Sequence, residues 1–251
     1  MKTKAELNTI AAEEMAESTP QNDIDVTLLK EMAEAGVLYG HKKNKTQPKF
    51  KPFIFMTRND MEIIDLAKTL KSIDAAAEFL NKLIKEKKTV LLVGTKPASW
   101  EALEKMSKTF GFPMIKNRWI GGLVTNFKII YQRIEYYRKT TKELEKGELD
   151  KYTKKERVVI AKRLAKMKVV FEGLDTFTKV PDAFFIVDTS VNSHDTALRE
   201  AKIMNIPIIA LIDSDDNPEK VNFPIPANDH SKLSINWVID RLISLVEKPS
   251  E

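Results

Sequence analysis

The sequence contains no cysteine in its 251 residues, so disulfides, thiolate nucleophiles and cysteine-based zinc sites are all excluded. The same absence points to a reducing compartment. No apolar run approaches the roughly 20 residues that a membrane-spanning helix needs. The polar opening, MKTKAELNTIAAEEMAES, has no secretory signal pattern. We therefore expect a cytoplasmic protein with no membrane partner.

The motifs of common enzymes are also missing. The turn after VLLV carries a single glycine, Gly94, instead of G-x-G-x-x-G, and neither a P-loop, a G-x-S-x-G elbow nor an H-E-x-x-H pair occurs. His41 and His194 lack metal-ligand spacing, so a structural or solvent-facing role is expected for each. The sequence therefore predicts no catalytic residue, no cofactor and no small-molecule substrate.

Positive charge is present in excess, and it is concentrated in two segments. The net charge is +5, whereas residues 41–58 alone contribute +6, because six Lys/Arg occur there without an acid. Residues 126–179 contribute a further +7, which leaves −8 for the remainder of the chain. Because interspersed charges would keep a protein soluble equally well, this segregation favours a polyanionic partner. A lysine-rich surface that meets only solvent is the alternative.

Short apolar runs alternate with helical patterns in both halves of the chain. The runs KTVLLVGT, FPMIKN, PDAFFIVDT, IPIIALID and NFPIP are typical of strands, and SWEALEKMSKTF and HDTALREAKIMN have a helical period. This alternation predicts an α/β domain, Rossmann- or flavodoxin-like, with a parallel sheet flanked by helices. Thr95 is the expected N-cap of the first of these helices. Before them, KPFIFMTRNDMEIIDL predicts a strand hairpin that turns at residues 58–60.

Residues 125–176 have a different pattern, with apolar side chains at steps of three and four. Thr125 is the expected cap of a first helix, and Thr153 with Glu156 forms a capping box at the start of a second. The short connection predicts an inserted antiparallel coiled-coil hairpin. Its two apolar seams are Phe127, Ile130, Ile134, Tyr137 and Leu144, then Ile160, Leu164, Met167, Phe171 and Leu174.

These patterns divide the chain into three parts. Residues 26–124 and 177–248 form the α/β domain, and residues 125–176 form the inserted helical hairpin. Residues 1–25 hold two lysines against six acids and are expected to be a poorly ordered acidic extension.

The stretch KNRWIGGLVTNFKII joins the sheet domain to the predicted hairpin. Its glycines, Gly121 and Gly122, are explained by a sharp bend with positive φ or by close backbone approach. Arg118 and Trp119 flank this bend and offer a guanidinium and an aromatic face, a pairing suited to RNA. Alternatively, Trp119 is buried and wedges the base of the hairpin onto the sheet.

Four aspartates follow predicted strands: Asp188, Asp213, Asp215 and Asp216. If they gather at neighbouring strand ends, their carboxylates offer oxygen ligands to a divalent ion. The other reading is that they cap helices and make turns. We assign no metal site from the sequence.

Many stretches occur in the order and spacing of a known family. They include TLLKEMAEAGVLYGHKKNKTQPKFKPFIF, IIDLAKT, VLLVGTK, NRWIGGLVTNFK, PDAFFIVDT and EAKIMNIPIIALIDSDDNPEKVNFPIPAND, and they cover about residues 26–247. In these motifs the chain resembles the bacterial ribosomal protein S2 family of the small subunit. One departure is KNKTQ, where family members have Arg-Arg-Trp-Asn. The change loses an aromatic residue and substitutes Lys for Arg. Bidentate recognition of a phosphate is therefore weakened, whereas the attraction of a point charge is kept.

The resemblance implies a structural, rRNA-binding component of the small subunit, placed where its head and body meet. It also implies a ribosome-bound location and contacts with neighbouring ribosomal proteins, among them the large OB-fold protein S1. Combined with the charge pattern, it predicts RNA contacts from Lys42, Lys43, Lys45, Lys49, Lys51, Arg58, Lys116, Arg118, Trp119, Asn126, Lys128 and Arg133.

The sequence leaves two alternative functions to be distinguished from this one. An α/β enzyme for a phosphorylated or acidic metabolite would concentrate positive charge in one cleft at the strand ends, where this sequence is acidic. A protein adaptor would carry a broad apolar outer stripe on residues 125–176, where the sequence shows one seam per helix.

Overall fold

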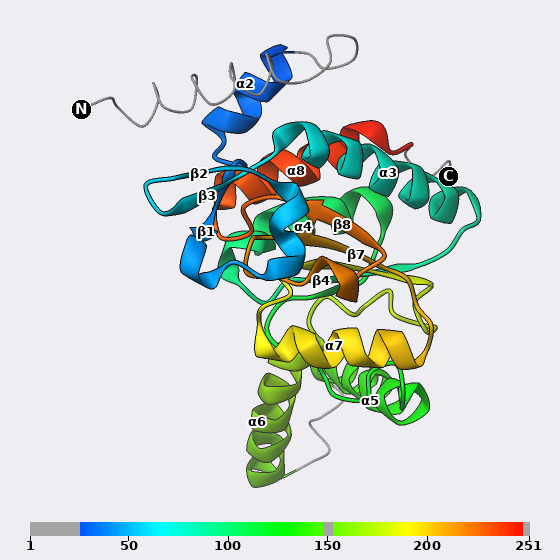
Figure 1. The fold of residues 1–251 in the computed structure, drawn as a ribbon. Coiled ribbons are helices and arrows are strands. Elements are labelled where there is room, and N and C mark those ends of the chain that lie inside the picture. Colours follow the sequence, from blue (N-terminus) through cyan, green and yellow to red (C-terminus); the bar gives the residue numbers. More distant parts are fainter. Residues whose placement is uncertain (1–25, 148–152, 248–251) are drawn as a thin grey trace.

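The computed structural model describes residues 26–147 and 153–247 (Figure 1). The predicted acidic extension, residues 1–25, lies outside the described residues. Among the described residues, no helix is long and apolar enough to cross a membrane.

A five-stranded, fully parallel sheet forms the centre of the protein. Its strand order is β5 (Met114–Ile115), β4 (Val90–Val93), β6 (Ala183–Val187), β7 (Ile208–Ile212) and β8 (Phe223–Pro226). Every residue of β4, β6 and β7 is buried, as expected for strands covered on both faces. The predicted α/β class is therefore confirmed.

Alternate residues of each strand point into two separate cores, because side chains alternate along a strand. On one face, Val90 and Leu92 pack beneath α3 (Leu66–Lys85), α4 (Pro97–Phe110) and α8 (Lys232–Leu245). On the other face, Leu91 and Val93 pack with α7 (Asn192–Ile203) and with buried residues of α5 (Phe127–Glu145) and α6 (Lys154–Phe171). Figure 1 shows these two layers above and below the sheet.

A second, three-stranded antiparallel sheet lies beside the first. Its order is β1 (Tyr39–Lys42), β3 (Met61–Ile64) and β2 (Ile54–Arg58), and the helix α2 (Val26–Glu34) precedes it. Asn59 and Asp60 both have positive φ, +48° and +61°, which suits a two-residue turn that matches strand twist. The predicted hairpin at residues 58–60 is confirmed.

The helices α5 and α6 pack together only in part. The capping box of Thr153 and Glu156 is present. Ile134 and Phe171 are buried in the core on the α7 face of the sheet, and Leu164 is also buried, whereas Leu144 is 47% exposed. The predicted seam is therefore not covered along its whole length, and the coiled coil is not confirmed.

Of the three predicted threonine caps, Thr153 is confirmed, whereas Thr95 and Thr125 are wrong because tertiary partners take their hydroxyl groups. The N-cap of α4 is Lys96, and the Thr95 hydroxyl instead lies 3.0 Å from Nε2 of His194. The N-cap of α5 is Asn126, and the Thr125 hydroxyl donates to Glu200 at 3.1 Å.

Candidate nucleic-acid interface

Residues 42–51, here called the lysine loop, run from the last residue of β1 toward β2. Two 3-10 turns, η1 (Lys43–Lys45) and η2 (Pro48–Phe53), fold the segment. Phe50 is fully buried, and the Gln47 amide donates to the carbonyl of Ser214 at 2.8 Å. These anchors hold the backbone while five side chains are exposed to solvent: Lys42, Lys43, Lys45, Lys49 and Lys51.

Within the described part of the chain, most lysines of the lysine loop have no ion-pair partner. Lys49 forms an ion pair with Glu219 at 2.7 Å, and both side chains are more than half exposed. For the other four lysines, no carboxylate of the described chain lies within ion-pairing distance. An exposed pair contributes about 0–1 kcal/mol, so a phosphate can displace Glu219 at little cost. Arg58, the remaining cation of this segment, ends β2 and is half-buried.

The predicted residues at the junction with α5 differ in accessibility. Lys116 forms an ion pair with Glu104 at 2.6 Å, and Arg118 is exposed. Asn126, Lys128 and Arg133 are exposed at the start of α5.

Trp119, by contrast, does not present its ring to solvent. It is 4% exposed, its ring centroid lies 5.5 Å from that of Phe184, and its Nε1 donates to Glu200 at 2.9 Å. The expectation of an accessible stacking platform is therefore wrong for this conformation. The structure takes the other alternative, in which the indole packs the base of α5 onto the sheet.

Glu200 of α7 organises this junction, and the sequence reading missed it. Its carboxylate accepts hydrogen bonds from Trp119 Nε1, from the backbone amides of Gly122, Val124 and Thr125, and from the Thr125 hydroxyl. Gly122 has φ +82°, which turns its amide toward the carboxylate. A signal was available, since Glu200 lies on the core-facing side of α7 beside Ala197 and Ala201.

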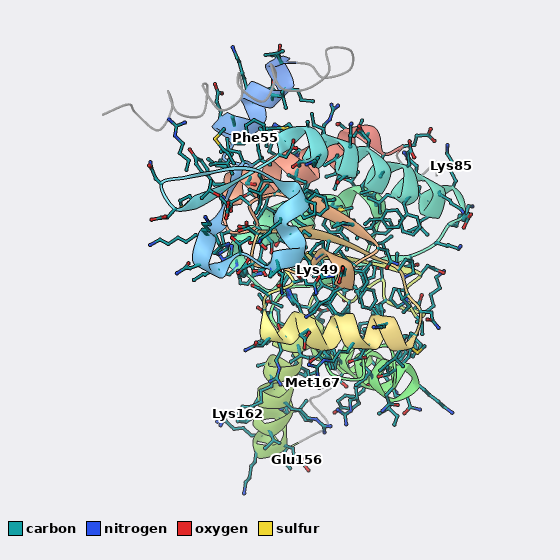
Figure 2. The ribbon with its side chains drawn as sticks, in the orientation of Figure 1. Lys49, Phe55, Lys85, Glu156, Lys162 and Met167 are labelled. Atoms are coloured by element: carbon teal, nitrogen blue, oxygen red, sulfur yellow. The ribbon has the colours of Figure 1, made fainter. Side chains whose placement is uncertain are left out.

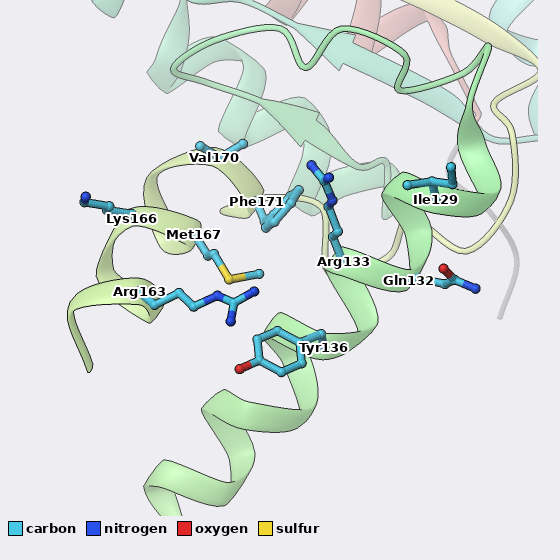
Figure 3. Close-up of a pocket in the computed structure, with 9 residues that line it drawn as sticks. All are labelled: Ile129, Gln132, Arg133, Tyr136, Arg163, Lys166, Met167, Val170 and Phe171. Atoms are coloured by element: carbon cyan, nitrogen blue, oxygen red, sulfur yellow. The ribbon is translucent and has the colours of Figure 1, made fainter. Parts of the chain in front are cut away.

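A groove of about 550 Å³ lies between α5 and α6 (Figure 3). Arg133, Arg163 and Lys166 contribute positive charge to it, and no acid is among its lining residues. The Arg163 guanidinium carbon lies 5.0 Å from the centroid of the Tyr136 ring, a cation–π geometry. Of these residues, only Arg133 was predicted to contact RNA.

The two basic segments belong to different parts of the molecule. Figure 2 shows Lys49 on the segment beside the sheets, whereas Lys162 projects outward from α6. Apolar side chains are also exposed on α6, with Val158 at 49%, Val159 at 61% and Val169 at 56%. These valines lie outside the predicted seam of α6.

The strand-end aspartates do lie together, and they make turns there. Asp216 accepts from the Thr189 hydroxyl at 2.6 Å and from the Asp213 amide at 3.2 Å. Asp188, with φ +68°, accepts from the amide and the hydroxyl of Ser190. These contacts support the turn-making alternative for Asp188 and Asp216.

The two histidines singled out in the sequence differ in their surroundings. His194 is fully buried between the Asp188 carbonyl and the Thr95 hydroxyl, which is the expected structural role. His41 is not solitary, because its Nδ1 lies 3.1 Å from Asp213 and 3.4 Å from Asp215.

Burial and neighbouring charges shift several pKa values in this region. Burial raises the pKa of Asp216 to about 6 and lowers the pKa of His194. Burial also raises the pKa of Asp188, but Lys96 and Ser190 outweigh it, so the pKa is lowered overall. The Asp213 carboxylate beside His41 raises the pKa of that imidazole.

This edge of the sheet does not provide an anion cleft. It holds buried carboxylates, and the exposed lysines of residues 42–51 lie on a separate loop. The molecule is therefore an α/β protein with a basic exterior, of the class that meets a polyanion over an extended surface.

Comparison with known proteins identifies the family. Residues 32–248 match the family model described as "Ribosomal protein S2". The chain is 38% identical over 221 residues to "Small ribosomal subunit protein uS2" of Coprothermobacter proteolyticus, covering 88% of this chain and 82% of that protein. It is 37% identical over 228 residues to the protein of the same name from Petrotoga mobilis, covering 91% and 78%. The chain belongs to the ribosomal protein S2 family, which consists of structural ribosomal proteins and not of enzymes.

Proposed function

We propose that this protein is a structural constituent of the small ribosomal subunit that binds rRNA through its basic surfaces. The observation that carries the proposal is the lysine loop, whose anchored backbone presents five exposed lysines. Membership of the ribosomal protein S2 family supports it independently. The site in the particle is the junction of head and body, and the location is the cytoplasm, bound to the ribosome.

The contact residues we propose fall into three groups. The first is the lysine loop with Arg58. The second is the junction, with Lys116 and Arg118, and the third is the start of α5, with Asn126, Lys128 and Arg133. Trp119 acts through packing, by holding Arg118 and the start of α5 in place.

Affinity in this proposal comes from neutralised phosphates and from RNA shape. Side chains cannot read the deep, narrow groove of A-form RNA, so lysine point charges suffice. Each lost phosphate contact should reduce the slope of log K against log salt by roughly 0.7–0.9. Single lysine substitutions should therefore have small and similar effects.

Residues 125–176 act in this proposal as an inserted unit between the two parts of the α/β domain, residues 26–124 and 177–248. We propose that α5 and α6 form a coiled-coil hairpin when the unit is docked. The exposed valines of α6 suit a protein partner, so neighbouring ribosomal proteins, including S1, are proposed to contact this unit.

The test is incorporation into small subunits. A variant with Lys42, Lys43, Lys45, Lys49 and Lys51 all changed to Gln should be strongly depleted from assembled subunits when it competes with the unchanged protein. The matched control changes five exposed lysines of α3, α4 and α8 to Gln: Lys71, Lys82, Lys85, Lys105 and Lys232. Equal incorporation of the two variants would refute a contact role for the lysine loop.

A further inference from the structure

Two histidines and three aspartates from four segments lie together at the carboxyl edge of the large sheet. One ligand atom from each of His41, Asp213 and His230 lies within 4.8 Å of the others, and the same holds for Asp188, Asp229 and His230. We call these five residues the His–Asp cluster. His230 belongs to both groups and therefore links them.

A fully buried carboxylate in the cluster has an unused oxygen. Asp229 is 0% exposed, and its Oδ1 contacts Nδ1 of His230. Its Oδ2 has no hydrogen-bond partner in the described part of the chain. A buried acceptor without a hydrogen-bond partner destabilises the folded state by about 1–3 kcal/mol, and by more when it is charged. Such an oxygen therefore indicates a bound cation or a hydrogen-bond donor.

The Nδ1 atom of His41 faces two carboxylate oxygens. This atom lies 3.1 Å from Oδ2 of Asp213 and 3.4 Å from Oδ1 of Asp215. Neither Nδ1 nor that Asp215 oxygen makes a hydrogen bond within the described residues. Ligands about 2.0–2.2 Å from a tetrahedral zinc ion are themselves roughly 3.3–3.5 Å apart. The 3.1 Å distance from His41 Nδ1 to the Asp213 oxygen is therefore close to the spacing of neighbouring ligands in one coordination shell.

The imidazole of His230 is oriented so that Nε2 is the ring nitrogen that offers a lone pair. An ammonium group can only donate, so the 3.0 Å contact of Lys96 Nζ with His230 Nε2 assigns the lone pair to Nε2. A metal ion bound at Nε2 would take the place of the Lys96 ammonium there. The ring proton is then on Nδ1, facing Asp229. A carboxylate that fixes the tautomer of an imidazole in this way is the usual outer partner of a metal-binding histidine.

Lys96 is a cation that the structure places in direct contact with the cluster. It forms an ion pair with Asp188, and its side chain is 31% exposed. One ammonium supplies a single charge for the carboxylates of Asp188, Asp213 and Asp229. Since Asp188 already has this partner, the group around His41 and Asp213 is the better place for a second cation.

We propose that the His–Asp cluster binds one divalent transition-metal ion of the zinc class, with His41, Asp213 and His230 as ligands and Asp229 orienting His230. Mixed imidazole and carboxylate donors select zinc-like ions over Mg²⁺ and Ca²⁺, which take oxygen ligands. Metal binding at this site requires no RNA, so the metal-site proposal can be tested independently of the proposed function.

The ion would join segments that are distant in the sequence. It would tie β1 to the loops that follow β7 and precede α8. Ser214 follows the ligand Asp213 in the chain. Its carbonyl accepts a hydrogen bond from the Gln47 amide at 2.8 Å, and its hydroxyl oxygen accepts one from the His41 amide at 2.7 Å. Metal binding would therefore stabilise the base of the lysine loop.

The test is titration of the untagged, chelator-treated full chain with ZnCl₂ by calorimetry, and with CoCl₂ by visible absorption. We expect about one equivalent of zinc and a cobalt spectrum typical of four-coordinate nitrogen and oxygen ligands. His41→Asn and His230→Asn should each weaken zinc binding at least tenfold. Asp229→Asn should weaken it roughly 10–100-fold as an outer partner.

The control is Asp240→Asn, which removes an exposed carboxylate paired with Lys105 and should leave zinc binding unchanged. Circular dichroism verifies that each variant is folded. His230 is half exposed, so its substitution leaves the core intact even where Asp229→Asn does not. Absence of zinc binding, or binding that is equal in His41→Asn, His230→Asn and the unchanged chain, would overturn the proposal.

Discussion

At the scale of single residues, Glu200 determines how the chain passes from the sheet into α5. It is 6% exposed and accepts from three backbone amides, an indole and a hydroxyl. Hydrogen bonds to an ionised acceptor are about twice as strong as neutral ones. The carboxylate thereby holds the turn that precedes α5 against α7.

Glu200→Gln should lower the free energy of unfolding by roughly 2 kcal/mol or more, because the new amide turns an NH₂ group toward N–H donors. Urea denaturation measures the change. The control is Glu135→Gln, which loses only an exposed pair with Arg138 and should cost about 0.5 kcal/mol or less. Similar losses for the two variants would show that the five contacts of Glu200 carry no special weight.

At the scale of elements, the strands were easier to predict than the helix caps. Buried parallel strands appear as continuous apolar runs, and PDAFFIVDT and IPIIALID required no further information. Thr95 and Thr125 have the residue type of a cap, but His194 and Glu200, which take their hydroxyl groups, are about 75 or more positions away in the chain. Local patterns do not contain such partners.

The same limit applies to the interface residues. Exposure of the lysine loop follows from its charge, so a basic surface there could be predicted. The burial of Trp119 depends on Phe184 and Glu200, which reach it only in the folded chain. The groove residues Arg163 and Lys166 depend on how α6 lies against α5, which heptad spacing alone leaves undetermined.

The junction of α6 with the sheet gives a test at this scale. Gly173 has φ +85°, its carbonyl accepts the Met114 amide at 2.7 Å, and a Cβ there would lie 2.6 Å from the Met114 carbonyl oxygen. Gly173→Ala should therefore destabilise the protein by roughly 3 kcal/mol, since strain of about 1–2 kcal/mol from φ adds to a backbone clash.

Gly111→Ala is the matched control for that substitution. Gly111 has φ +72°, but nothing lies within 4 Å of the Cβ that alanine would add. Its cost should be limited to the φ strain of about 1–2 kcal/mol. If thermal denaturation gave both variants the same loss of stability, close approach of β5 to residue 173 would not be the reason for the glycine.

At the scale of the whole molecule, the exposed positive charge is separated from the buried carboxylates. The carboxyl edge of the sheet is acidic and largely buried, while the lysine loop, the junction and α5 and α6 carry exposed cations. An enzyme for an anionic metabolite would need the reverse arrangement. An extended basic exterior matches a folded polynucleotide, whose phosphates are distributed over a surface.

The most direct test of this account is the salt dependence of binding to purified small-subunit rRNA. The five-lysine variant of residues 42–51 should reduce the slope of log K against log salt by roughly 3.5–4.5 relative to the unchanged protein. The control variant, in which Lys71, Lys82, Lys85, Lys105 and Lys232 are changed to Gln, should leave that slope unchanged. A slope that is the same for the unchanged protein and the lysine-loop variant would contradict the central claim that these lysines neutralise phosphates.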